Sequence, residues 1–404
     1  MSLLNNIQKY INKYGEPDAI IDSWDSNSNK YMIWGFESIC MYKNGFFSVD
    51  DVLFEGNPLD LLNDKIDNWS DNNDSKISAL GFISYDFKNI LFPHLNIRQT
   101  SSNPLFWFAK PKIIIEFKDE NLSDFFNEDF GMELIFDIPN INNYKKAVSK
   151  IKTHLQNGDV YQINYTNPKK YKIDGNPLSI YSALRNIAEP NNGYYINTGY
   201  NYILSLSPES FFNVKNNIIE TKPIKGTRKK YNNNKNDFNK INELKNSEKD
   251  KAEHLMIVDL LRNDLGKICE FDSINVLDLF NVESYKTIHH MVTKIKGELK
   301  SNITFSNIIK AMFPGGSITG APKERAVEII DSIEENYRNI YTGTIGHITD
   351  SHDMDFNIAI RTLIIVKGIG LYNIGGGIVW DSDPILEWEE ANIKSNILNN
   401  ILLK

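Results

Sequence analysis

A glutamate near the end of the chain falls where apolar spacing predicts a buried face. The segment that begins at Asp383-Pro384 is predicted to be a helix, because proline is favoured at the first helical position. At roughly 100° per residue, Glu390 projects within the helix's apolar stripe. That stripe consists of Leu386, Ile393, Ile397 and Ile401.

Two interpretations of this glutamate remain open from spacing alone. Glu387 and Lys394 flank it at i−3 and i+4, and the Glu390–Lys394 spacing suits a solvated ion pair worth about 0.3–0.5 kcal/mol. Alternatively, a carboxylate that faces the core must be neutralised by a proton, a cation or a metal.

A second glutamate repeats this pattern in the middle of the chain. A long helix is predicted from an N-cap at Ser247 to a C-cap at Gly266, and Glu253 projects between Ile257 and Leu260 on a nearly all-apolar, buried surface. A lone glutamate of this kind is more often a paired structural carboxylate. Two of them on two buried helices would suit Mg²⁺, because a small number of carboxylates together with substrate oxygens can hold this ion.

Lys225 differs from the solvated lysines that follow it. It lies in Pro223-Ile224-Lys225-Gly226-Thr227-Arg228, directly after a predicted strand. Desolvation would lower the pKa of this amine and make its neutral form a usable nucleophile. By itself, the pattern is more typical of a lysine in a turn.

Two glycine-rich segments offer backbone that a ligand can approach. The segment 315–323 (GGSITGAPK) lacks the Gly-Lys-Ser/Thr ending of a phosphate-binding loop, so it is weak evidence for nucleotide binding. Gly375, Gly376 and Gly377 interrupt a predicted strand, where glycine indicates either a close backbone approach or a β-bulge. Backbone N–H groups at this position could receive a small carboxylate.

The elements that must position these residues indicate an α+β fold with antiparallel sheets. A helix is predicted from the spacing of residues 144–155, with Gly158 as its stop. Strand-like runs are predicted at 31–34, 113–117, 194–206, 211–221, 341–348, 356–366 and 371–379, with a turn at 215–217, and a further helix at 302–312. The Asn/Asp/Ser-rich stretch 64–74 is predicted to be a surface excursion.

Composition excludes several classes of protein. The 404 residues carry a net charge of −8, which argues against a basic nucleic-acid-binding face. No apolar run approaches the length of a membrane helix, and no signal peptide is recognisable. The two cysteines, Cys40 and Cys269, cannot form a disulfide framework or a metal cluster. We therefore expect a soluble, cytoplasmic enzyme.

Several long motifs in the second part of the chain resemble those of the chorismate-binding enzymes, which include anthranilate, aminodeoxychorismate and isochorismate synthases. These motifs are 158–162 (GDVYQ), 207–209 (SPE), 223–228, 253–266 (EHLMIVDLLRNDLG), 315–323 and 375–394. The resemblance covers roughly residues 140–400 and predicts a catalytic portion at 140–404 after a variable portion at 1–130 that contributes to the same sandwich. It implies two stacked antiparallel sheets with helices outside.

The resemblance also assigns roles to individual residues. Glu253 and Glu390 match Mg²⁺ ligands, with Asp250 and Glu387 alongside. Glu209 matches the acid that protonates the departing 4-hydroxyl, His290 a histidine implicated in proton transfer, and Lys225 the covalent nucleophile. Positions around chorismate and its carboxylates are matched by Gln162, Thr227, Ser317, Tyr341, Arg361, Gly375, Gly376, Gly377 and Lys394.

Within the family, the sequence is most similar to the aminodeoxychorismate synthases of folate synthesis. Isochorismate-forming members carry a water-activating lysine where Gln162 stands, and glutamine cannot deprotonate water, which favours ammonia as the nucleophile. Anthranilate synthases usually carry alanine in place of Lys225 and Gly-Thr-Leu-Ser-Gly in place of 316–320. The Glu37-Ser38 pair resembles the tryptophan-pocket motif of anthranilate synthases, so that alternative remains.

Neither cysteine has the surroundings of a glutamine-hydrolysing nucleophile. We therefore expect ammonia to come from a separate glutamine amidotransferase subunit. A remote alternative is a non-catalytic metabolite-binding regulator, which the retention of every proposed acid, metal ligand and lysine disfavours.

Overall fold

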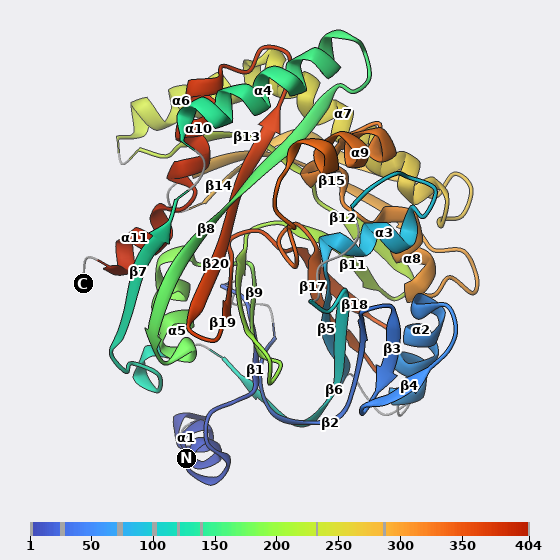
Figure 1. Ribbon diagram of the computed structural model, residues 1–404, viewed down its shortest axis with the longest axis vertical. Helices are drawn as coiled ribbons and strands as arrows, with labels where there is room; N and C mark the ends of the chain where they lie inside the picture. Colours follow the sequence, from blue (N-terminus) through green and yellow to red (C-terminus); the bar gives the residue numbers. More distant parts are fainter. Residues whose placement is uncertain are drawn as a thin grey trace.

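The computed structural model describes residues 3–24, 29–70, 76–98, 103–118, 122–137, 140–231, 233–285 and 288–402. Every strand pairing within these ranges is antiparallel, and helices cover the outside of the strands (Figure 1). The predicted α+β class is confirmed.

The strands and helices have the following bounds. The strands are β1 Ala19–Asp22, β2 Lys30–Lys43, β3 Phe46–Val49, β4 Val52–Phe54, β5 Ile77–Ile83, β6 Phe106–Phe117, β7 Phe130–Phe136, β8 Gln162–Gly175, β9 Asn192–Asn197, β10 Tyr202–Ser207, β11 Ser210–Lys215, β12 Ile218–Thr221, β13 Ile224–Lys229, β14 Asn275–Ser284, β15 Ile288–Glu298, β16 Gly320–Ala321, β17 Thr344–Thr349, β18 Met354–Ile358, β19 Thr362–Val366 and β20 Ile369–Ile378. The helices are α1 Leu3–Tyr14, α2 Pro58–Trp69, α3 Lys88–Leu91, α4 Ile141–Gln156, α5 Pro177–Ala188, α6 Asn234–Asn246, α7 Glu248–Gly266, α8 Phe305–Met312, α9 Lys323–Ile333, α10 Pro384–Ile393 and α11 Asn396–Leu402.

The strands form two layers that share one hydrogen-bond network. The first layer has the order β7-β8-β20-β19-β10-β9-β1-β2. The second has the order β6-β5-β17-β18-β11-β12-β15, and β15 also pairs with β13 and β14. Because β2 pairs with β6 from Lys30 to Tyr42, these long strands join the layers (Figure 1). The expected stacked sheets are confirmed, as two layers of one continuous network.

Apolar side chains fill the space between the layers. A core cluster there takes Ile33 from β2, Phe82 from β5, Trp107 from β6, Ile203 from β10 and Ile345 from β17. The outer face of one layer packs against α2, α7 and α8, and that of the other against α1, α5 and α11. Strands in the middle of the layers, such as β5 and β10, are therefore buried on both faces, whereas β7 and β14 are largely exposed.

The first third of the chain is part of the same sandwich. Strand β1 pairs with β9, and β5 pairs with β17, so early and late segments alternate within each layer. A division near residues 130–140 stays a prediction.

Two of the places where the chain passes between the layers are adjacent crossovers. Two predicted strand runs, 194–206 and 356–366, are each two strands, and the second run is divided between the layers at Ala359–Arg361. The first crossover is Pro208–Glu209, between β10 and β11. The crossovers are tied together by Ile358 N–H, which donates to the Glu209 carbonyl at 3.0 Å, and by Leu206 N–H, which donates to the Arg361 carbonyl at 3.1 Å. Both crossovers thus carry a predicted site residue.

The long helix is confirmed as α7, and the Ser247 hydroxyl caps it by accepting a hydrogen bond from Asp250 N–H at 3.2 Å. It is not buried all round, however, because Leu255 and Asp259 are exposed. One face packs on the sheet while the other meets solvent, which a count of apolar residues does not reveal.

The predicted C-terminal apolar stripe is wrong. The helix breaks after Ile393 and resumes at Asn396, and Leu386 and Ile393 are 65% and 64% exposed. Buried Ser395 donates its hydroxyl to the Asn392 carbonyl at 2.7 Å, an alternative to helical pairing that accompanies the break. Only the later part of the stripe, including Ile401, is buried.

The predicted surface excursion at 64–74 is also partly wrong. Its beginning is the end of α2, where Ile66 and Trp69 are buried, because apolar helical spacing outweighs the local Asn and Asp content. Residues 71–75 lie outside the described residues.

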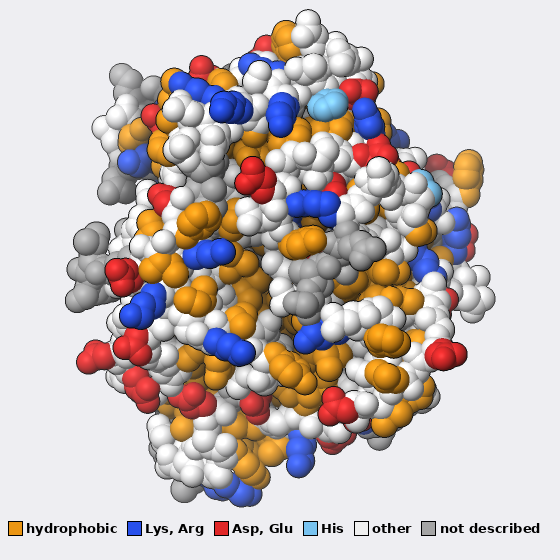
Figure 2. All heavy atoms as spheres, viewed as in Figure 1, with side chains coloured by type: hydrophobic (Ala, Val, Ile, Leu, Met, Phe, Trp, Pro, Cys, Tyr) orange, Lys and Arg blue, Asp and Glu red, His pale blue; other side chains and the backbone are white. Residues whose placement is uncertain are grey.

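Within the described residues, no helix is long and apolar enough to cross a membrane. On the face shown in Figure 2, the described acidic and basic side chains are interspersed and form no continuous basic area.

Gly346 of β17 lies opposite Gly81 of β5 on one side and Phe356 of β18 on the other. A methyl group at Gly346 would overlap the Asp355 carbonyl and approach the Phe356 ring to 2.5 Å. We expect Gly346→Ala to lower the free energy of unfolding by about 1–3 kcal/mol, measured by denaturant titration. Gly266→Ala, at the end of α7 with open space around it, is the control and should be neutral or slightly stabilising. Equal stability of the two variants would contradict the packing argument.

Candidate active site

Lys225 projects from a bulge in β13 toward the start of β8. The register with β15 shifts between Lys225 and Thr227, and the intervening Gly226 has a φ of 68°, a conformation that glycine adopts readily. The Lys225 Nζ donates to Gln162 Oε1 at 3.3 Å. Gln162 is fully buried, and its Nε2 has no hydrogen-bond partner among the described residues. A buried amide donor without a partner is costly and marks a place where a ligand can bind.

The glycine run of β20 leaves room for these groups. β20 pairs with β8 in unbroken register over residues 369–378, so the β-bulge interpretation is wrong. A Cβ at Gly377 would lie only 3.3 Å from Lys225 Nζ and 3.1 Å from Gln162 Nε2. At Gly376 a Cβ would lie 3.6 Å from Lys394 Nζ. A side chain at Gly377 would therefore crowd Gln162 and Lys225, whereas one at Gly376 would only touch Lys394.

Lys394 holds the edge of the same strand. Its Nζ donates to the Gly375 carbonyl at 2.9 Å. β19 pairs with β20 only as far as Tyr372, so the following glycines have an edge that this lysine reaches. Lys394 lies immediately after α10, which therefore docks against the glycine run.

Opposing effects act on the charge of Lys225. Burial lowers the pKa of its amine, while the carboxylates of Glu253, Glu209 and Glu390 raise it. Three carboxylates from α7, α10 and the first crossover therefore lie within electrostatic range of one amine. Lys225 therefore lies within electrostatic range of both Glu253 and Glu390, and the roles expected of these residues stay predictions.

Glu209 sits at the first crossover and is held by the glycine-rich turn. The Ser317 hydroxyl, in the 3₁₀ turn Gly316–Ile318, donates to Glu209 Oε1 at 2.8 Å. Burial raises the pKa of Glu209, and the Ser317 bond and the charges of Lys225 and Lys394 partly oppose this shift. Tyr341 is close enough for Glu209 to contribute to the raised pKa of its buried phenol. A carboxyl group with a raised pKa retains a proton more readily and suits general acid chemistry.

The four carboxylates predicted to hold metal have different surroundings. Glu390 does not face the core: its side chain is 62% exposed and pairs with Lys394 at 3.0 Å, so the ion-pair interpretation of its spacing is correct in this structure. Asp250 Oδ2 accepts from Arg228 at 2.8 Å, and Glu387 Oε1 accepts from the Ser382 hydroxyl at 2.7 Å. Glu253 is 23% exposed and lies 3.9 Å from Lys249.

These carboxylates nevertheless place several negative charges within electrostatic range of one another. Burial raises the pKa of Glu253, and Asp250 and Glu387 raise it further. Burial likewise raises the pKa of Glu387, to which Glu390 contributes. No group of three or more His, Cys, Asp or Glu among the described residues forms a preassembled metal site. The hard oxygen donors fit Mg²⁺ if substrate oxygens complete its coordination.

His290 and Thr227 form a second group beside Arg361. Thr227 Oγ1 and His290 Nδ1 lie 2.9 Å apart. Burial, aided by the Arg361 charge, lowers the pKa of His290 to about 4, so its imidazole is neutral at physiological pH. Arg361 has a φ of 49° at the second crossover, and its guanidinium has no carboxylate partner within the described part of the chain.

The end of the glycine-rich segment 315–323 is fixed by residues that the sequence did not single out. Lys323 begins α9, but its Nζ donates to Asp264 Oδ2 and the Met312 carbonyl, each at 2.7 Å. The amine is thus anchored to α7 rather than offered to a phosphate. The sequence shows a lysine directly after Ala321-Pro322, but it does not show that its partner is Asp264, which lies 59 residues away.

Comparison with known proteins identifies the family. The sequence pattern of the chorismate binding enzymes matches residues 23–400. The chain belongs to this family. The match also covers most of the first third, which extends the resemblance beyond residues 140–400.

Relatives within the family carry different names. Anthranilate synthase component 1 of Saccharolobus solfataricus is 35% identical over 340 residues, which span 81% of each chain. Aminodeoxychorismate synthase component 1 of Bacillus subtilis is 38% identical over 261 residues, which span 65% of this chain and 56% of that protein. The crystal structure of anthranilate synthase component I from Streptococcus pneumoniae superposes with a TM-score of 0.80 at 26% identity, covering 91% of both chains.

Glu253 stabilises the ammonium form of Lys225 in this geometry. Removing that negative charge makes deprotonation easier, so Glu253→Gln should lower the pKa of Lys225 further. We expect the pH midpoint of Lys225 acylation, followed by peptide mass spectrometry, to move to lower pH. Glu220→Gln is the matched control, because Glu220 pairs with Lys294 and Lys296 instead. An unchanged midpoint in Glu253→Gln would show that Glu253 does not act on this amine.

Proposed function

We propose that the protein is an aminodeoxychorismate synthase component I, which converts chorismate and ammonia into 4-amino-4-deoxychorismate for folate synthesis. One observation carries the proposal: the half-buried Lys225 amine lies beside Gln162 and within range of Glu209 and Glu253. This arrangement supplies a nucleophile, an acid and a carboxylate-rich wall in one region.

The residues around the amine favour this member of the family over others. A glutamine at 162 cannot activate water, which disfavours isochorismate formation. It holds the Lys225 amine instead, through the 3.3 Å hydrogen bond. A nucleophilic lysine at 225 distinguishes the aminodeoxychorismate branch, since anthranilate synthases usually carry alanine there.

The first chemical step joins Lys225 to the substrate. Its neutral amine adds at C2 of chorismate, the ring double bonds shift, and the C4–O bond breaks. Protonated Glu209 donates its proton to the departing 4-hydroxyl, which leaves as water. The adduct nitrogen releases its extra proton to solvent, and one difficult displacement has become two easier ones.

The second step reverses this pattern with ammonia. Ammonia adds at C4, the double bonds shift back, and the C2–N bond to Lys225 breaks. The Glu209 carboxylate accepts a proton from the new C4 ammonium group, and the leaving lysine nitrogen takes up from solvent the proton that it released in the first step. The products are 4-amino-4-deoxychorismate, water and the original enzyme.

The surrounding residues bind and orient the substrate. Arg361 is suited to a bidentate pair with a substrate carboxylate, and Lys394, Gly375, Gly376 and Gly377 offer a cation and backbone donors to another. Ser317 and Tyr341 border Glu209, and His290 with Thr227 supplies a neutral imidazole for proton transfer. Glu253 and Glu390, with Asp250 and Glu387 alongside, would hold Mg²⁺. When bound, the ion neutralises and orients a substrate carboxylate.

Ammonia would come from a separate glutamine amidotransferase subunit. Both cysteines of the chain are buried, and burial raises the pKa of Cys40 and raises that of Cys269 to about 11. A thiol in such surroundings is an inert structural group rather than a glutamine-hydrolysing nucleophile.

Anthranilate synthase component I is the second candidate. It is favoured by the Saccharolobus solfataricus relative, whose match spans 81% of this chain. That reaction would release pyruvate and anthranilate, so the products separate the two functions. A non-catalytic regulator is disfavoured because the acid, the lysine and the carboxylates are gathered together.

We expect the purified chain to convert chorismate to 4-amino-4-deoxychorismate with Mg²⁺ and ammonium, but not with glutamine alone. The product is identified by mass spectrometry, with and without a downstream lyase. Anthranilate and pyruvate would favour the second candidate. Glutamine use by the isolated chain would contradict the need for a partner.

Lys225→Ala should abolish the covalent chorismate adduct in intact-protein mass spectrometry and lower kcat by orders of magnitude. Lys222→Ala is the matched control, because Lys222 lies on the same segment but pairs with Glu283 at 2.7 Å. It should retain the adduct. Persistence of the adduct in Lys225→Ala would remove the nucleophile assignment.

A further inference from the structure

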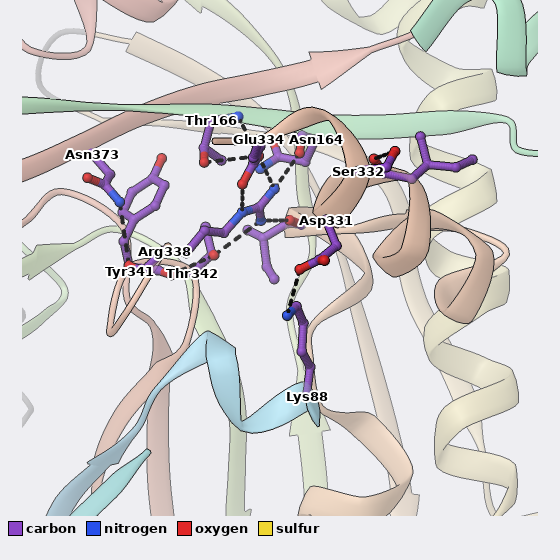
Figure 3. Close-up of polar contacts among 12 residues, drawn as sticks. Lys88, Asn164, Thr166, Asp331, Ser332, Glu334, Arg338, Tyr341, Thr342 and Asn373 are labelled. Atoms are coloured by element: carbon purple, nitrogen blue, oxygen red, sulfur yellow. Dashed lines mark hydrogen bonds and ion pairs between the residues drawn. The ribbon is translucent and has the colours of Figure 1, made fainter. Parts of the chain in front are cut away.

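A buried arginine lies behind the proposed site with all its donors in use. Arg338 is 2% exposed and lies between α9 and β17 (Figure 3). Its Nε and Nη2 donate to the two carboxylate oxygens of Glu334 at 2.9 and 2.7 Å. Nη1 donates to the Ile318 carbonyl at 2.8 Å and to Thr342 Oγ1 at 3.2 Å, and Nη2 also donates to the Asn164 carbonyl at 2.6 Å. These contacts occupy every N–H of the guanidinium.

The acceptors belong to different walls of the proposed site. Asn164 lies on β8 two residues after Gln162, and Ile318 follows Ser317 in the turn that holds Glu209. The Arg338 carbonyl accepts from Tyr341 N–H at 3.1 Å and from Asn373 Nδ2 at 3.4 Å, two residues before the glycine run of β20. One residue therefore touches four segments, each of which carries a proposed substrate- or acid-positioning group.

Glu334 completes this arrangement. Its Oε1 accepts from Thr166 N–H at 2.9 Å and from the Thr166 hydroxyl at 3.1 Å, which anchors β8 a second time (Figure 3). The Arg338 guanidinium also lies 4.4 Å from the centre of the Tyr85 ring. The charge is thus buried, paired and fully hydrogen-bonded, the condition under which a polar network rigidifies its surroundings.

We propose that Arg338, held by Glu334, is a positioning residue that sets the Ser317–Glu209 contact relative to Gln162 and the β20 glycines. This inference rests on the proposed function for its catalytic meaning, but the geometry it invokes can be measured without turnover. Arg338 contacts neither the reacting amine nor Glu209, so it acts only through the segments that it joins.

A lysine cannot replace this arginine. The planar guanidinium directs its five donors in fixed directions, whereas an ammonium offers three on a flexible stem. Arg338→Lys keeps the charge opposite Glu334, but three donors on one nitrogen cannot reproduce the five bonds that the guanidinium makes in fixed directions. We expect the turn to shift and the Ser317–Glu209 hydrogen bond to lengthen.

The ionisation of Glu209 reports this shift. Ser317 donates to the Glu209 carboxylate and stabilises its charged form. Lys225 and Lys394 also favour that form, and the Tyr341 phenol lies within electrostatic range of it. Loss of the Ser317 bond therefore raises the pKa of Glu209. Ser317→Ala removes the bond directly and shows the direction and size of the change.

The test follows the Glu209 carboxyl by ¹³C NMR in the ligand-free full chain, with Glu209→Gln to assign the resonance. The matched control is Asp331→Asn, which breaks the neighbouring buried pair between Asp331 and Lys88 (3.3 Å) but touches no wall of the site (Figure 3). We expect Arg338→Lys to raise the titration midpoint in the same direction as Ser317→Ala, and Asp331→Asn to leave it unchanged. In turnover, Arg338→Lys should lower kcat by about 10- to 100-fold.

The outcomes separate this proposal from the proposed function. If Arg338→Lys leaves the Glu209 midpoint at its wild-type value, or if Asp331→Asn shifts it equally, the positioning role is wrong. If the midpoints behave as expected but the wild-type chain makes no aminodeoxychorismate, only the proposed function fails. Should Arg338→Lys not fold, Glu334→Gln replaces it: a smaller shift in the same direction supports the proposal, and an unchanged midpoint overturns it.

Discussion

Backbone hydrogen bonding through β2 and β6 is the constraint on which the rest of the structure depends. Because these strands pair with each other and with strands of both layers, the sandwich is one network rather than two separate sheets. A chain that fills both layers must cross between them, and its backbone groups need partners where the ladders end. At the crossovers Ser207 Oγ donates to the Ile358 carbonyl at 2.6 Å. Glu209 and Arg361 therefore occupy positions between strands, where the backbone takes no part in a regular ladder.

Charge balance governs the region that these crossovers border. Lys225 loses hydration on burial, and Glu253, Glu209 and Glu390 partly restore the stability of its ammonium form. Lys394 and Glu390 pair at the more exposed rim, where an ion pair contributes little to folding. Lys225, Glu209 and Glu253 therefore stabilise one another's charged forms, whereas the Glu390–Lys394 pair is open to solvent.

Much of the fold was predictable because its signals are local. Ser247 caps α7 as expected, and the strand runs near 341–379 were recognised from apolar content and turns. The predictions that were wrong share a cause. Periodicity shows which residues lie on one face of a helix, but not whether that face packs against the protein or is exposed to solvent. Glu390 has the spacing of a core residue yet is exposed, because the helix breaks at Lys394–Ser395 and turns the later apolar residues elsewhere. Of the Arg338 network, only the i,i+4 spacing of Glu334 and Arg338 is visible in the sequence, because its other partners come from segments as far apart as Asn164, which accepts, and Asn373, which donates.

The sequence by itself determined the family, the residue types available for chemistry and the antiparallel α+β class, since motifs, donor groups and short-range periodicity are properties of the chain alone. Only the tertiary structure decided which of those groups meet. It brought Lys225 to Gln162, Glu209 to Ser317 and Arg338 to four separate segments. The physical reason is that burial and pairing depend on distances between segments far apart in sequence, and those distances follow from how the two layers share their strands.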